Sequence, residues 1–188
     1  MLTGIIKYSH HLLEKSITEG ECVIDATCGN GNDTLFLSKL VGDSGRVYAF
    51  DIQEQAINNS KNLLNENGKT NVTFIQDSHA NLNKYIAEHG EKEIGAAIFN
   101  LGYLPRSDKE IITKGDSSIK AINSILSLLK KDGLIVLVVY HGHEGGAEEK
   151  EMILKHVIQL DQKDYSVLQY GFINQKNKPP FILAIQKR

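Results

Sequence analysis

Short apolar runs rich in β-branched residues alternate along the chain with longer stretches in which apolar residues recur every three or four positions. The runs predict strands, and the longer stretches predict amphipathic helices that bury one face. Expected strands span residues 21–27, 46–51, 72–76, 94–99, 134–140, 165–173 and 181–186. Expected helices span residues 2–17, 34–40, 53–67, 80–89, 118–131 and 148–160. This alternation predicts an α/β fold, a doubly wound and mostly parallel seven-stranded sheet with an antiparallel last strand.

The turn after the first expected strand is the strongest sign of a ligand site. Gly29 and Gly31 lack a Cβ atom, so the turn can adopt positive φ angles and a ligand can approach its backbone. The helix that follows directs free N–H groups toward the same place, which suits a carboxylate or a phosphate. Asp51 ends the second expected strand, where a carboxylate can hold ribose hydroxyls. The stretch predicts a nucleotide-type site, and the alternative is a tight glycine turn without a ligand.

This turn departs from the fingerprint of dinucleotide-binding proteins. The fingerprint has a third glycine, and Thr34 stands in its place. The departure favours a ligand without a pyrophosphate. An NAD-dependent oxidoreductase is therefore a rival class of enzyme that the sequence disfavours.

Further polar segments follow other expected strands, at the edge of a parallel sheet where ligands bind. Ser78 and His79 follow the third strand, where a hydroxyl can meet an adenine amino group and an imidazole can lie against the base. The alternative is that Asp77 or Ser78 only caps the next helix. Asn100 follows the fourth strand, and His141 and His143 follow the fifth. We expect these side chains to face one crevice.

Together these segments resemble a known family of enzymes. The matching blocks are residues 8–13 (YSHHLL), 25–34 (DATCGNGNDT), 77–79 (DSH), 100–105 (NLGYLP) and 140–146 (YHGHEGG). The second block, followed by Asp51, resembles the first two motifs of class I S-adenosylmethionine-dependent methyltransferases. The whole set resembles a small bacterial family, formerly called rRNA methylases and now assigned as tRNA 5-aminomethyl-2-thiouridine methyltransferases. The similarity covers essentially the whole chain and implies one Rossmann-like methyltransferase domain over residues 1–188.

The resemblance implies that the cofactor is S-adenosylmethionine. The cofactor-binding residues would be Asp25, Thr27, Gly29, Asn30, Gly31, Asn32, Asp51, Gln53, Ser78 and His79. The implied substrate is the wobble uridine in the anticodon loop of tRNA, whose aminomethyl nitrogen would be methylated. An anticodon loop suits such an enzyme, because protein readout of RNA favours splayed single-stranded bases.

Residues 100–103 stand where amino-group methyltransferases have an Asp/Asn-Pro-Pro-aromatic motif. By that similarity, the side-chain oxygen of Asn100 and the backbone carbonyl of Leu101 would hold the acceptor nitrogen, and Tyr103 would pack on the substrate. Leu101 and Gly102 replace the two prolines, so this substrate-binding loop is less stiff than the motif. The alternative for Asn100 is a turn residue that only ends the strand.

His141 and His143 alternate with Gly142, so both side chains point the same way if the segment is extended. His141 is a candidate for relaying the amine proton and His143 for contacting the substrate, because histidine titrates near neutral pH. A structural role is equally open for both. A metal pair has thin support, and we expect no metal site.

Composition and cysteine content predict the size of the domain and the cellular compartment. The 188 residues, 41% of them hydrophobic and 23% charged, suffice for one globular domain with a sizeable core. The sequence has neither an apolar run of membrane-spanning length nor a signal-peptide pattern, so we expect a soluble cytoplasmic protein without membrane contact. Cys22 and Cys28 stand at opposite ends of one expected strand and cannot bridge each other, which agrees with a reducing compartment.

The net charge of −2 argues against a large non-specific nucleic-acid binder. Contact with RNA would then come from local cations such as Arg106 and Lys176, or from a second copy of the chain in a homodimer. The polar stretch 104–117 around Arg106 has the length of an active-site loop. The modest charge leaves rRNA and small-molecule N- or O-methyltransferases open. A binding module without turnover is the rival outside catalysis, and the intact block at Asn100 argues against it.

Overall fold

A computed structural model describes residues 1–102 and 114–188 of the chain. Within these residues the chain forms a seven-stranded sheet in the order β3-β2-β1-β4-β5-β7-β6. The strands are β1 (Cys22–Asp25), β2 (Arg46–Asp51), β3 (Val72–Gln76), β4 (Ile94–Leu101), β5 (Leu129–Val139), β6 (Tyr165–Tyr170) and β7 (Phe181–Lys187). β7 is antiparallel to both of its neighbours, and the other neighbouring strands are parallel. The expected fold class and the antiparallel last strand are confirmed.

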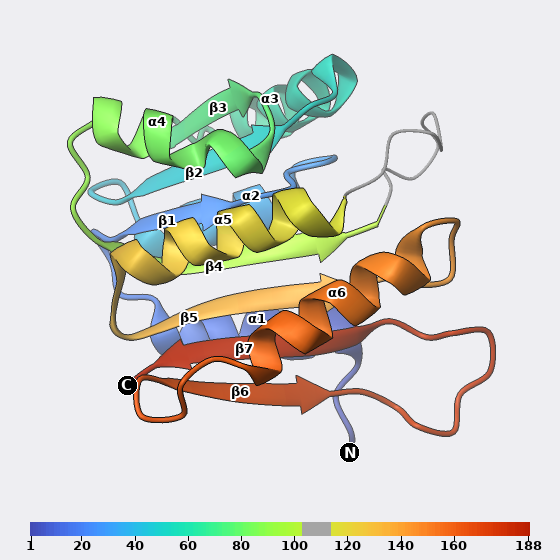
Figure 1. Ribbon diagram of the computed structural model, residues 1–188. Coiled ribbons are helices and arrows are strands. Elements are labelled where there is room, and N and C mark those ends of the chain that lie inside the picture. The colour runs from blue at the N-terminus through green and yellow to red at the C-terminus, as the bar shows by residue number, and fades with distance from the viewer. Residues whose placement is uncertain (103–113) are drawn as a thin grey trace.

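The strand order contains a reversal that determines where a ligand can bind. From β1 the chain proceeds outward through β2 to β3, and β4 then returns to the other side of β1. In open parallel sheets, ligands bind at such a reversal, beyond the carboxyl ends of the strands. Figure 1 shows these ends on the right, where the turn after β1, the end of β4 and the segments that follow β5 and β6 lie. The polar segments singled out from the sequence therefore share one edge of the sheet.

Helices cover both faces of the sheet. They are α1 (Ile5–Ser16), α2 (Asn32–Val41), α3 (Glu54–Glu66), α4 (Leu82–Glu88), α5 (Gly115–Leu128) and α6 (Gly146–Ile158), with a 3-10 turn η1 (His79–Asn81) before α4. In Figure 1, α4, α5 and α6 lie in front of the sheet, and α1, α2 and α3 lie behind it. Cover on both faces explains the continuous apolar run of β5, in which residues 133–139 are all buried.

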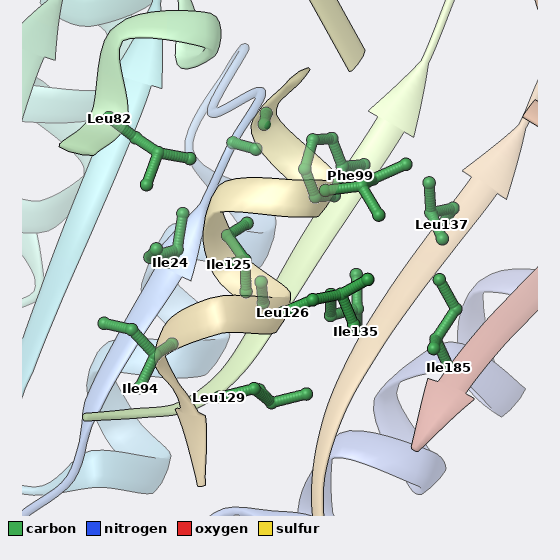
Figure 2. Close-up of a cluster of buried hydrophobic side chains, with 14 of the residues drawn as sticks. Ile24, Leu82, Ile94, Phe99, Ile125, Leu126, Leu129, Ile135, Leu137 and Ile185 are labelled. Carbon is green, nitrogen blue, oxygen red and sulfur yellow. The ribbon is translucent and has the colours of Figure 1, made fainter. Parts of the chain in front are cut away.

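A large hydrophobic cluster lies between the sheet and the front helices. Figure 2 shows Ile125 and Leu126 of α5 beside residues of the strands, among them Ile24 of β1 and Ile135 of β5. None of these four side chains is more than 5% exposed. Burial of one such side chain contributes about 1.5–3 kcal/mol. Phe99 extends the cluster toward the carboxyl end of β4, so the candidate site stands on a packed and rigid base.

The boundary between α5 and β5 differs from the prediction. The helix expected over residues 118–131 begins at Gly115 and ends at Leu128. Tertiary pairing is the reason, because Leu129 is 2% exposed and pairs with Ile94 of β4 as the first residue of β5. Apolar periodicity continues past Leu128 and cannot show that the next residue joins a sheet.

Candidate active site

The turn between β1 and α2 has the backbone conformation that its glycines predict. Gly29 and Gly31 have φ angles of 50° and 85°. Gly31 is the N-cap residue of α2 and, being a glycine, makes no side-chain cap hydrogen bond. The first N–H groups of α2 can therefore bind an anionic group of a ligand. Asn30 and Asn32 are exposed on either side of Gly31.

Replacing Gly31 with alanine is expected to destabilise the protein by about 2–4 kcal/mol. An added Cβ would lie 2.8 Å from the Cα of Ser60 in α3, and the φ of 85° strains any side chain. Gly68→Ala is the matched control, because Gly68 has a φ of 64° and nothing lies within 4 Å of its added Cβ. The control should lose only about 1 kcal/mol. Urea denaturation measures both, and equal losses would show that the contact with Ser60 costs nothing.

Asp51, at the end of β2, supports this turn and presents a carboxylate beside it. Its Oδ2 accepts a hydrogen bond from the N–H of Gly29 at 3.0 Å, and its Oδ1 accepts one from the N–H of Gln53 at 3.0 Å. Burial raises the pKa of Asp51, and the backbone donors oppose this rise. A carboxylate has about four lone-pair sites, so this one can accept two ribose hydroxyls as well.

Asp25 lies beneath the turn and is fully buried. Its Oδ2 accepts a hydrogen bond from the hydroxyl of Thr34 at 2.7 Å, and its Oδ1 accepts one from the N–H of Thr27 at 3.2 Å. Burial and the nearby carboxylate of Asp33 raise the pKa of Asp25 to about 7. These bonds join the end of β1 to the start of α2, so Asp25 supports the turn from below.

Asp25→Asn is expected to stabilise the protein increasingly, relative to the wild type, as the pH rises. The pKa is about 7 in the folded state against an ordinary 3.8, so between these values the folded state holds a proton that the unfolded chain has released. The stabilising contribution of the protonated Asp25 carboxyl is therefore complete below about pH 4, and it is lost as the pH rises to about 7. Asparagine does not titrate. The unfolding free energy of Asp25→Asn minus that of the wild type should therefore rise by roughly 2–4 kcal/mol between about pH 4 and 7.

Denaturant unfolding of the wild type and Asp25→Asn between pH 4 and 8 measures this shift. Asp43→Asn is the control, because Asp43 is exposed and its nearest cation, the Nζ of Lys69, lies 3.9 Å away. Parallel stability curves for Asp25→Asn and the wild type would contradict the prediction.

Asn100, in the carboxyl-terminal part of β4, is held through its backbone and its side chain. Its N–H donates to the hydroxyl of Thr27 at 2.7 Å, and its side-chain NH₂ donates to Oδ2 of Asp33 at 2.5 Å. A carboxylate can only accept, so the amide nitrogen must be the atom that faces Asp33. The Oδ1 of Asn100 is directed away from Asp33, and no donor among the described residues contacts it.

Asp33, in the first turn of α2, connects Asn100 to the N-terminal helix. Its Oδ1 lies 2.6 Å from Nε2 of His10 in α1. The imidazole of His10 stacks on Phe36, with ring centroids 3.9 Å apart and ring planes 8° apart. The N-terminal helix therefore reaches the candidate site through His10.

Ser78 and His79 lie where the chain leaves β3 and enters η1. The hydroxyl of Ser78 accepts a hydrogen bond from the N–H of Ala80 at 3.2 Å, which is the capping role left open by the sequence. Nδ1 of His79 donates to the carbonyl oxygen of Ala26 at 3.0 Å, and Nε2 is buried without a partner among the described residues. Burial lowers the pKa of His79, so the ring is neutral near pH 7 and Nε2 is an unused acceptor.

Leu101 and Gly102, beside Asn100, are both buried. The carbonyl oxygen of Leu101 accepts a hydrogen bond from the N–H of Tyr140 at 2.9 Å, so one of its two lone pairs remains for a substrate nitrogen. An added Cβ at Gly102 would lie 3.2 Å from the Cβ of Tyr140. Tyr140 as a whole is 38% exposed, and burial followed by the charge of Asp33 raises the pKa of its hydroxyl. Tyr140 thus lies near Asp33 at this edge of the sheet.

The other predicted residues that the structure describes lie after β5 and in the connection between β6 and β7. Nε2 of His141 donates to the carbonyl oxygen of Pro179 at 3.1 Å, which favours a structural role for this ring. His143 packs at the start of α6, where an added Cβ on Gly146 would lie 2.8 Å from its Cε1. Lys176 is exposed in the connection between β6 and β7. Tyr103 and Arg106 lie outside the described residues.

Within residues 1–102 and 114–188, no group of three or more histidine, cysteine, aspartate or glutamate side chains could hold a metal ion. Cys22 and Cys28 are both buried and free, in agreement with the prediction that they do not bridge. None of the helices in the described part of the chain is long and apolar enough to cross a membrane.

The groups at the carboxyl edge suit S-adenosylmethionine better than a dinucleotide. An uncapped helix start matches the carboxylate of that cofactor, and Asp51 matches its ribose. At the position of the third glycine, the side chain of Thr34 is instead buried against Asp25, where it supports the turn. With an antiparallel β7 at the far side of the sheet, the fold and the site define a class I S-adenosylmethionine-dependent methyltransferase.

Comparison with known proteins gives the family within this class. Residues 47–186 match the family described as "Putative rRNA methylase", and the chain belongs to that family. Residues 5–81 also match the family of protein-L-isoaspartate(D-aspartate) O-methyltransferases.

Individual relatives agree with this placement. A chloroplastic tRNA (mnm(5)s(2)U34)-methyltransferase of Arabidopsis thaliana is 37% identical over 188 residues, which cover 95% of this chain and 68% of that protein. A Clostridium thermocellum structure with the same description as the family is 42% identical, with a TM-score of 0.96 and complete coverage of both chains. A Streptococcus mutans structure, described as a methyltransferase in complex with SAH, is 41% identical, with a TM-score of 0.91 and complete coverage of both chains.

Sequence reasoning missed three residues of the site, namely His10, Asp33 and Tyr140. All three lie inside the blocks that carried the family resemblance, and membership of those blocks is the signal that could have identified them. Their contacts could not be inferred locally, because 23 residues separate His10 from Asp33 along the chain and 67 separate Asp33 from Asn100.

Proposed function

We propose that this methyltransferase acts on the aminomethyl nitrogen of the wobble uridine of tRNA and produces its methylaminomethyl form. The observation that supports the proposal is the amide of Asn100, whose oxygen is directed away from Asp33 and can accept an N–H of an amine. The name of the Arabidopsis thaliana relative, a tRNA (mnm(5)s(2)U34)-methyltransferase, supports tRNA as the substrate.

In this proposal the cofactor occupies the edge beyond β1 and β2. S-adenosylmethionine, when bound, would supply a sulfonium methyl group for in-line attack, in which the C–S bond breaks and S-adenosylhomocysteine leaves as a neutral thioether. The residues that would contact it are Gly29, Asn30, Gly31, Asn32, Asp51, Gln53, Ser78 and His79. Asp25 and Thr27 would act from below, by fixing the turn. The Streptococcus mutans relative, described as being in complex with SAH, supports S-adenosylmethionine as the cofactor.

The chain's task toward the acceptor is to orient an unprotonated amine. The Oδ1 of Asn100 and the remaining lone pair of the Leu101 carbonyl would accept its two N–H bonds, which directs the nitrogen lone pair toward the methyl group. As the new C–N bond forms, the nitrogen becomes a cation and releases a proton to solvent or a nearby base. Tyr140 would border the uracil beside Gly102, together with Tyr103.

Contact with the rest of the anticodon loop is the remaining part of the proposal. The RNA around the wobble base would contact Arg106, His143 and Lys176. Phosphate contacts of this kind supply affinity with little specificity. A second copy of the chain would enlarge the cationic surface, since the net charge of −2 is low for an RNA-binding protein.

Mass spectrometry of nucleosides tests the substrate. In tRNA from cells that lack this protein, we expect the aminomethyl-thiouridine precursor to accumulate and the methylaminomethyl product to be absent. The wild-type gene should restore the product, and a gene for Asn100→Ala should not. Purified protein incubated with this tRNA and S-adenosylmethionine should complete the conversion. An unchanged nucleoside profile would refute the tRNA proposal, and methylation of rRNA in the same assay would support the family's older description instead.

A further inference from the structure

Three polar side chains from distant segments form a continuous chain of hydrogen bonds beside the proposed acceptor site. Nε2 of His10 in α1 meets Oδ1 of Asp33 in α2 at 2.6 Å, and Oδ2 of Asp33 meets the NH₂ of Asn100 in β4 at 2.5 Å. The side chains of His10 and Asp33 are only 26% and 14% exposed. Low exposure strengthens such charge-assisted bonds, because little water competes for the same atoms.

The chemistry of this chain determines which way the Asn100 amide faces. The two ends of an asparagine amide have nearly the same shape, so only their hydrogen-bond partners distinguish them. Asp33 accepts and cannot donate, so it holds the NH₂ end and leaves the oxygen on the other side. The backbone N–H of Asn100 is also fixed, by Thr27 at 2.7 Å. The remaining freedom is rotation of the amide, and Asp33 restricts it.

Asp33 itself needs a partner to keep this orientation. Burial and, after it, the nearby charge of Asp33 raise the pKa of Asp25, so an ionised Asp25 would repel the carboxylate of Asp33. His10 supplies an N–H on the opposite oxygen of Asp33, and the stack on Phe36 fixes the plane of its ring. Thus α1 contributes the group that completes the hydrogen bonding of Asp33.

We propose that His10 is a positioning residue for methyl transfer, which acts through Asp33 to hold the amide oxygen of Asn100 toward the acceptor nitrogen. The inference rests on the proposed role of Asn100 and extends it to the N-terminal helix. It predicts that the loss of His10 affects the chemical step and leaves binding of both substrates nearly unchanged.

Steady-state kinetics with undermethylated tRNA tests the inference. His10→Ala should lower kcat by about tenfold or more, because small misplacements of a reacting group are costly, while KM for tRNA and Kd for the cofactor change less than about twofold. His10→Gln should recover much of the rate, since its side-chain NH₂ can also donate to Asp33. His11→Ala is the matched control, because His11 is the exposed neighbour in the same helix. Equal rates for His10→Ala and His11→Ala, or a loss confined to binding, would overturn the inference.

A measurement without substrate separates this inference from the proposed function. The side-chain NH₂ resonances of Asn100 in ¹⁵N-asparagine-labelled protein should move or broaden in His10→Ala and return in His10→Gln. The NH₂ of Asn71 is the internal reference, because it donates to the carbonyls of Ser38 and of Gly42, the C-cap residue of α2, whereas Asp33 lies in the first turn of that helix. Unchanged Asn100 resonances would overturn the positioning role. Wild-type protein that methylates no tRNA would refute the proposed function, whereas the resonances would still decide whether His10 orients Asn100.

Discussion

Asn100→Ala is expected to lower the turnover number by about a hundredfold, which corresponds to ~2.7 kcal/mol of lost transition-state stabilisation. The variant removes the one amide oxygen that is oriented by Asp33 and available to an acceptor amine. Affinity for S-adenosylmethionine should stay within about twofold, since the groups that hold the cofactor lie on the turn after β1 and at the end of β2.

Single-turnover methylation of tRNA and titration calorimetry with S-adenosylmethionine measure these two quantities separately. Asn83→Ala is the matched control, because Asn83 is exposed in α4 and makes one side-chain hydrogen bond, to Ser124 at 2.9 Å. An equal loss of turnover and cofactor affinity in Asn100→Ala would mean that Asn100 supports the structure at the carboxyl edge of the sheet and has no special part in the reaction.

The second large effect is expected at Asp51. Asp51→Ala should weaken binding of S-adenosylmethionine by about 2–3 kcal/mol, roughly a hundredfold, because the ribose hydroxyls lose their acceptor. The same substitution leaves the N–H groups of Gly29 and Gln53 without the carboxylate that now accepts from them. The turn after β1 would then lose its connection to β2.

Comparison of two ligands distinguishes the ribose role from a general effect of charge. S-adenosylhomocysteine has the same ribose and lacks the positive sulfonium. Equal losses for both ligands are expected if Asp51 holds the ribose, and a much larger loss for S-adenosylmethionine would indicate long-range attraction alone. Asp43→Ala, which removes an exposed carboxylate elsewhere, should leave both affinities unchanged. Unchanged affinities in Asp51→Ala would refute the ribose role.

Several features of the site were predictable because they depend on residues close together in the chain. The glycines of the β1–α2 turn adopt the positive φ angles that their missing side chains permit. β2 spans residues 46–51 and β3 spans residues 72–76, as the apolar runs predict. Since Asp51 ends β2 beside the turn, its contact with Gly29 follows from the parallel pairing of β1 with β2.

Other features were beyond local reasoning. His141 is a candidate for relaying a proton if only its neighbours in the sequence are considered, yet its Nε2 donates to Pro179, 38 residues away. The position of Asp25 also needed the structure, because a motif can place a carboxylate at a strand end without showing that it is fully buried. Burial makes Asp25 a support of the turn and raises its pKa to about 7.

The sequence by itself determined the α/β fold, the glycine turn, the carboxylate that ends β2 and, through its motif blocks, the methyltransferase class. These depend on periodicity and turn chemistry, which act over a few residues. The tertiary structure alone decided that His10, Asp33 and Asn100 meet, and that α5 ends at Leu128 so that β5 can pair with β4. Such contacts depend on how the helices pack on the sheet. A local pattern in the chain does not encode which residues this packing brings together.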